Sequence, residues 1–113
     1  MTEVPQIADL GGLPVEVVSL ESPGVVAVTA WANDGDTVTL TWDEIAGSAS
    51  VRWIAGEETR LSLERELLSK ISVREEAAGR VEFWIWSESP ELGGQLIVRV
   101  GVRVSVEDAL LRV

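Results

Sequence analysis

The stretch ANDGDTVTLTW, residues 32–42, decides the fold class of this chain. Its Asp34-Gly35 pair lies between two runs rich in β-branched residues. It predicts a β-hairpin with a type I′ turn, which needs positive φ at both central residues. The residues after the turn alternate strictly between threonine and an apolar residue, here Val38, Leu40 and Trp42. This period of two is typical of an antiparallel strand with one polar, exposed face and one apolar, buried face.

Similar strand signals recur in both directions along the chain, about ten residues apart. The strands that we expect are 15–20, 25–32, 37–42, 51–55, 71–75, 80–88 and 95–106. The last and longest has an apolar residue at every second position on one face, which predicts a central core strand with a bulge or bend at Gly101. About seven to eight short strands separated by turns predict a mainly β chain, an antiparallel β-sandwich or barrel.

Residues 59–71 support two interpretations. Four apolar residues recur there at helical spacing, namely Leu63, Leu67, Leu68 and Ile71. With Ser62 as an N-cap, this spacing predicts one short helix over Leu63–Lys70. The competing interpretation is a strand over Thr59–Glu64. A helix at this place would also permit an α+β alternative, in which a sheet carries a helix packed on one face.

We expect residues 1–113 to form a single domain, because this length is close to the commonest domain size. Residues 1–12 read as a leader segment that can hold one short strand, at Gln6–Leu10. No segment reads as a signal peptide, and no apolar run approaches the ~18 residues needed to cross a bilayer. The chain contains no Cys, which fits a reducing compartment, so we expect a cytoplasmic protein.

The charge balance indicates which partners the chain can attract. It has nineteen acidic residues against nine basic ones, for a formal net charge of -10. Phosphate backbones and anionic membranes are bound through basic patches, so we expect no nucleic-acid ligand and no membrane binding. A basic protein partner would be steered toward the chain by the same charge. The sequence leaves the oligomeric state open.

The residue types that the chain lacks exclude most catalytic sites. It has no His and no Cys, so the usual nucleophile–base pairs of hydrolases are missing, and no phosphate-binding glycine motif is present. We therefore expect a non-enzymatic protein that needs no cofactor. The acids around the Asp34 turn do not have the spacing of an EF-hand loop, and we expect no metal site.

A pair of tryptophans is the strongest candidate for a binding site. Trp84 and Trp86 share one face of the expected strand 80–88 with Glu82 and Glu88. Two indoles framed by carboxylates can stack on a sugar or a cation, or form the hot spot of a protein interface. In the competing interpretation, both faces of this strand are buried and the rings belong to the core.

Two acidic pairs in expected turns extend this candidate site, namely Glu57, Glu58, Glu75 and Glu76. We therefore predict a non-enzymatic acidic protein-binding domain that docks a basic protein. One concrete form is an immunity- or antitoxin-type inhibitor of a cationic toxin. The alternatives are a small-ligand or carbohydrate-binding module that uses Trp84 and Trp86, and a structural or assembly subunit.

Overall fold

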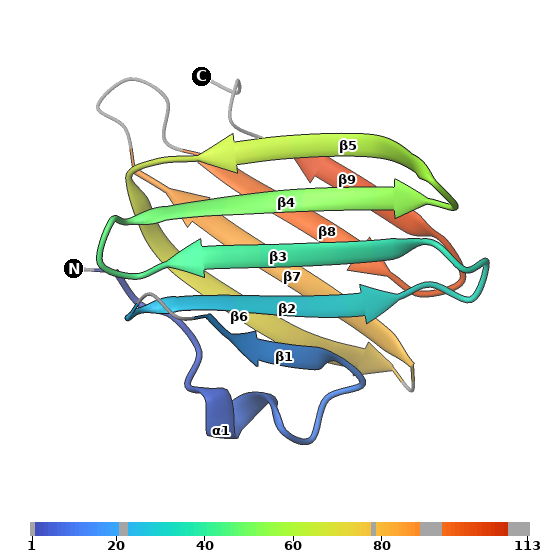
Figure 1. Cartoon of the computed structure of the whole chain (residues 1–113), viewed down its shortest axis with the longest axis horizontal. Helices are drawn as coiled ribbons and strands as arrows, with labels where there is room; N and C mark the ends of the chain where they lie inside the picture. The colour runs from blue at the N-terminus through green and yellow to red at the C-terminus, as the bar shows by residue number, and fades with distance from the viewer. Residues whose placement is uncertain (1, 21–22, 78, 89–93, 109–113) are drawn as a thin grey trace.

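The chain folds into two antiparallel β-sheets packed face to face (Figure 1). The computed structural model describes residues 2–20, 23–77, 79–88 and 94–108. The five-stranded sheet contains β1 (Glu16–Ser19), β2 (Val25–Trp31), β3 (Thr37–Asp43), β4 (Ser48–Ala55) and β5 (Glu58–Arg65). The four-stranded sheet contains β6 (Leu68–Ala77), β7 (Arg80–Ser87), β8 (Gly94–Val100) and β9 (Val104–Asp108). The predicted antiparallel sandwich is confirmed, with nine strands in the described residues where seven to eight were expected.

The core lies between the sheets and is built by the alternation seen in the sequence. On β3, Val38 and Leu40 are 0% exposed and Trp42 is 1% exposed. The facing sheet contributes Phe83 and Ile85 of β7, which are also fully buried. Because successive side chains of a strand point to opposite faces, the residues between these positions lie on the outer faces of the sandwich.

The predicted β2–β3 hairpin is present, but its turn is not type I′. Gly35 has a φ of 96°, whereas Asp34 does not have positive φ. The Gly35 N–H donates to the Ala32 carbonyl at 3.1 Å, and the Ala32 N–H donates to the Asp36 carbonyl at 2.9 Å. This is the three-residue hairpin loop, in which only the last residue needs a left-handed conformation. The Asn33 N–H of this loop donates to the carbonyl of Gly101, in the loop between β8 and β9, at 2.8 Å.

The helix predicted over Leu63–Lys70 is wrong, and the competing strand over Thr59–Glu64 is confirmed by β5. The chain turns a corner at Glu66 and Leu67 and passes into the other sheet, with Leu67 at a φ of 54°. Leu63 therefore packs on the core from one sheet, and the buried Leu68 does so from the other. The helical spacing arises because two strand patterns are joined out of phase at this corner.

The single strand predicted over Gln95–Val106 is in fact two strands, β8 and β9, joined by a hairpin. Val100 pairs directly with Val104, and the Gly101 N–H donates to the Arg103 carbonyl at 3.1 Å. A three-residue loop between paired positions keeps the alternation in phase. The sequence pattern therefore continues unbroken through the turn, although Val102 lies at its tip and is 62% exposed.

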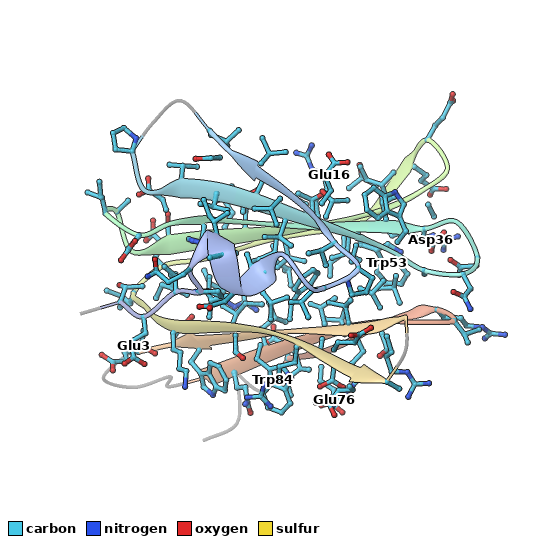
Figure 2. All side chains as sticks on the ribbon, turned by 90° about the horizontal axis from the view of Figure 1, so that it is seen from below. Glu3, Glu16, Asp36, Trp53, Glu76 and Trp84 are labelled. Carbon is cyan, nitrogen blue, oxygen red and sulfur yellow. The ribbon has the colours of Figure 1, made fainter. Side chains whose placement is uncertain are left out.

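The first residues close one edge of the sandwich. The extended piece expected at Gln6–Leu10 is instead the helix α1 (Ile7–Leu10), which lies at the edge formed by β1 and β6 (Figures 1 and 2). The helical turn directs Leu10 into the core, where it is 2% exposed. Before it, Glu3 exchanges backbone hydrogen bonds with Ser69 and Ile71, which covers the open edge of β6. No helix in the described part of the chain is long and apolar enough to span a bilayer.

Candidate functional site

The outer faces of the two sheets differ in chemistry. The five-stranded sheet presents small hydroxyl residues in neighbouring rows, among them Thr29, Thr39, Thr41, Ser50 and Ser62. The four-stranded sheet presents a set that we call the tryptophan face, made of Lys70, Arg74, Glu82, Trp84, Trp86 and Arg99. Figure 2 shows Trp84 and Glu76 on the side of this sheet that points away from the other sheet. The tryptophan face thus combines two indoles with arginine and lysine side chains, whereas the outer face of the five-stranded sheet carries one tryptophan, Trp31, and Arg52 beside its hydroxyl residues.

The two tryptophans stack on each other. The ring centroids of Trp84 and Trp86 are 5.7 Å apart, with an angle of 29° between the ring planes. Each ring also carries a cation from β6: the guanidinium carbon of Arg74 lies 4.5 Å from the Trp84 centroid, and Lys70 Nζ lies 5.3 Å from the Trp86 centroid. The rings are half-buried on the outer face, so the interpretation that places them in the core is wrong.

A buried carboxylate holds the tryptophan face in place. Glu82 is 7% exposed and accepts hydrogen bonds at 2.9 Å from both Trp84 Nε1 and Arg99 Nε. Arg99 also reaches Glu107, with 3.3 Å between Nη1 and Oε2. Burial by itself would raise the pKa of Glu82, but the hydrogen bonds from Trp84 and Arg99 outweigh it and leave this pKa below its ordinary value. The same contacts raise the pKa of Arg99, chiefly through its hydrogen bond to Glu82. The orientation of the Trp84 indole is thus fixed by a charged network.

The other predicted acids lie at different distances from this face. Glu76 lies on the same outer side of the four-stranded sheet as Trp84 (Figure 2). Glu75 is instead the register partner of the inward-facing Val81, and it accepts a hydrogen bond from the Gly79 N–H at 3.3 Å. Glu88 shares an open pocket with Trp86, Lys70, Ser69 and Glu3.

Glu57 and Glu58 do not join the other predicted acids. They lie at the turn into β5, in the five-stranded sheet, whereas the tryptophan face belongs to the four-stranded one. The single acidic surface that would include all four turn acids is therefore not formed.

The two cations on the rings were missed by sequence reasoning. Lys70 is the register partner of Trp86, and Arg74 is the register partner of Glu82, on the neighbouring strand β6. A register of this kind can be read only once residues 68–77 are recognised as one strand, and the helix prediction for Leu63–Lys70 hid it. Alternation of Lys70, Ser72 and Arg74 with the apolar Ile71 and Val73 was the available signal.

Comparison with known proteins bears on the fold. No protein-family model matches the chain, and no curated protein matches its sequence. Among solved structures, it is similar to a chain of the "Contact-dependent growth inhibition toxin - immunity protein complex from Klebsiella pneumoniae 342", with a TM-score of 0.76. The likeness covers 95% of this chain and 95% of that chain, at 19% sequence identity. At this level of identity, the two chains share a fold.

Proposed function

We propose that this chain is an immunity-type protein that binds and inhibits a protein toxin. The observation that carries the proposal is the likeness to a chain of a toxin–immunity complex, at a TM-score of 0.76 over 95% of both chains. Of the two roles in such a complex, that of the inhibitor fits this sequence better. It has no His or Cys to supply a nucleophile or a general base, and an inhibitor needs neither. We accordingly propose a non-enzymatic role, in the cytoplasm.

The tryptophan face is the surface that we propose for docking the toxin. Tryptophan and arginine are the residue types most enriched in interface hot spots, and here they are interleaved on one sheet face. The Trp84 indole is already fixed by Glu82 at 2.9 Å, so little side-chain freedom is lost when a partner covers it. The outer face of the five-stranded sheet also carries a tryptophan, Trp31, which is 49% exposed, but the described residues of that face hold no stacked pair of rings.

Long-range charge would add to the speed of binding. The chain carries a net charge of -10, and the described ion pairs engage only the arginines Arg65 and Arg99. A field of this sign attracts a cationic toxin and accelerates encounter, while short-range contacts at the tryptophans determine how long the complex lasts. We therefore propose a toxin with a basic surface as the partner.

The geometry favours this hypothesis over carbohydrate binding. A sugar-binding platform needs an open ring face, but Trp84 and Trp86 stack on each other and are approached by Arg74 and Lys70. A sugar would have to displace a cation from its ring. A protein partner can instead use the ring edges together with the charged groups around them.

The test is co-expression with the protein encoded beside this chain, measured as rescue of growth and as binding kinetics of the purified pair. Trp84→Ala and Trp86→Ala should each weaken binding by about 2 kcal/mol or more, mostly through faster dissociation. Thr39→Ala, on the other sheet, is the matched control and should leave affinity unchanged. Melting curves must show that each variant folds. If both alanine variants bind as tightly as the wild type, the interface lies on another surface. If the chain neutralises no toxin, the proposed function is wrong.

A further inference from the structure

Three arginines line one pocket of this acidic chain. The pocket lies at the β8–β9 hairpin, and its lining consists of Arg80, Arg99 and Arg103 together with Gly101, Val102 and Ser105. The chain has only nine basic residues, so a third of them gather at this one place. The pocket adjoins the tryptophan face, because Arg99 belongs to both.

One of these arginines is held by ion pairs, and a second lies against the hairpin. Arg80 lies against the hairpin at Gly101, where an added Cβ would come within 3.2 Å of Arg80 Nε and 3.3 Å of Arg80 Cγ. Glycine therefore gives the Arg80 side chain the room to lie there. Arg99 is fixed by Glu82 at 2.9 Å and by Glu107 at 3.3 Å. Arg99 thus gives the pocket one fixed cation, to which the exposed Arg80 and Arg103 add two more.

Arg80 and Arg103 lack a carboxylate partner within the described residues. No Asp or Glu oxygen of that part of the chain lies within 4.0 Å of either guanidinium. Surplus acids are abundant in this sequence, yet none of the described acids neutralises the two cations that face the pocket. A positive pocket on a chain of this net charge suits a ligand that brings one or two carboxylates, whereas a polyanion would be repelled by the whole molecule.

We propose that this pocket binds an Asp or Glu side chain of the protein partner. The identity of that partner rests on the proposed function, but the chemistry of the pocket does not. The guanidinium groups of Arg80 and Arg103 donate to the carboxylate, and the Ser105 hydroxyl is a further donor at the rim. A toxin that presents a cation at this place meets like charge. The pocket therefore selects among basic partners that overall charge alone would attract equally.

The test uses the full chain and two short peptides, one with two glutamates between neutral residues and one with glutamines in their place. Nitrogen-15 spectra should show the glutamate peptide shifting the amides of Gly101 to Arg103 and the side-chain Nε–H groups of Arg80 and Arg103. Arg103→Gln should weaken this binding about two- to fivefold, on the scale of exposed ion pairs, and Arg80→Lys should weaken it similarly. Arg60→Gln, on β5, is the matched control and should change nothing.

Three outcomes would overturn the assignment: equal shifts with the glutamine peptide, shifts spread evenly over Arg52 and Arg60, or inorganic phosphate binding more tightly than the glutamate peptide. Because the probe is a peptide, a positive result stands even if no toxin is neutralised. Conversely, a toxin that is neutralised equally well by the Arg103→Gln variant would leave the proposed function intact and remove this pocket from the interface.

Discussion

At the scale of single residues, Glu82 carries the most consequence. A carboxylate that is 7% exposed would ordinarily be costly to bury, and here Trp84 and Arg99 offset that cost with hydrogen bonds at 2.9 Å. One side chain thereby connects the aromatic pair, through Arg99, to the arginine pocket. Removing its charge leaves two donors with a weaker acceptor, so the stability of the fold and the order of the tryptophan face should change together.

We expect Glu82→Gln to lower the free energy of unfolding by about 1–3 kcal/mol at neutral pH. The pKa of Glu82 is lowered in the folded state, so its contribution is complete above the pKa of an unfolded glutamate. It is lost as the pH falls through the lower, folded value. Denaturation curves between neutral and strongly acidic pH should therefore show a loss of stability in the wild type that is smaller in the variant. Glu58→Gln, at an exposed turn, is the control. Parallel pH profiles for wild type and Glu82→Gln would contradict the role given to this carboxylate.

At the scale of elements, the β8–β9 hairpin gives two neighbouring valines very different burial. Val100 is 1% exposed at the end of β8, and Val102 is 62% exposed at the hairpin tip, although both fall on the apolar side of the sequence pattern. Val100→Thr should cost about 1–3 kcal/mol because it buries a hydroxyl group, and Val102→Thr should stay within about 0.5 kcal/mol. Urea denaturation of the two isosteric variants measures the difference. Equal losses would mean that residues 95–106 form one continuous strand.

The corner between the sheets allows a similar test. Leu67 has a φ of 54° and is 63% exposed, so its side chain contributes little while its backbone is strained. Relief of about 1–2 kcal/mol of left-handed strain should exceed the entropic cost of a glycine, about 0.5–1 kcal/mol. We therefore expect Leu67→Gly to be neutral or to raise the melting temperature. In a helix the same substitution would cost about 1 kcal/mol, so a clear destabilisation would contradict the corner.

Local sequence patterns predicted the strands well where a strand is uninterrupted. They failed where the chain passes from one sheet to the other, and where a turn leaves the apolar–polar alternation unchanged. The alternation on β3 and the separation of faces on β7 were readable because each lies within one straight strand. Hydrophobic periodicity does not reveal that the chain passes to the other sheet at Glu66-Leu67. It also does not reveal the turn at Gly101, because a three-residue loop leaves the alternation of apolar and polar residues unchanged. The tryptophan face was predicted in part: Trp84, Trp86 and Glu82 share a strand, whereas Lys70 and Arg74 join them through a register that only the fold determines.

At the scale of the whole molecule, the surplus of negative charge should affect stability most. A net charge of -10 on 113 residues repels itself, and few of the described carboxylates have a cationic partner. Salt screens such repulsion over a Debye length of about 10 Å at 0.1 M. Raising NaCl from about 20 to about 200 mM should therefore raise the melting temperature. A fall over this range would mean that ion pairs stabilise the fold more than net repulsion destabilises it.

The chain crosses between the two layers at the corner after β5, which has a consequence for how the protein is made. Residues 16–65 contain every described strand of the first layer, so a ribosome delivers that layer complete before the second begins. At a synthesis rate of roughly 5–20 residues per second, the apolar inner face of this first sheet stays uncovered for about 2–9 s before the remaining strands are made. During this interval the exposed apolar face can aggregate with other nascent chains. A chaperone that binds the incomplete chain should recognise the apolar row formed by Val28, Leu40 and Val51.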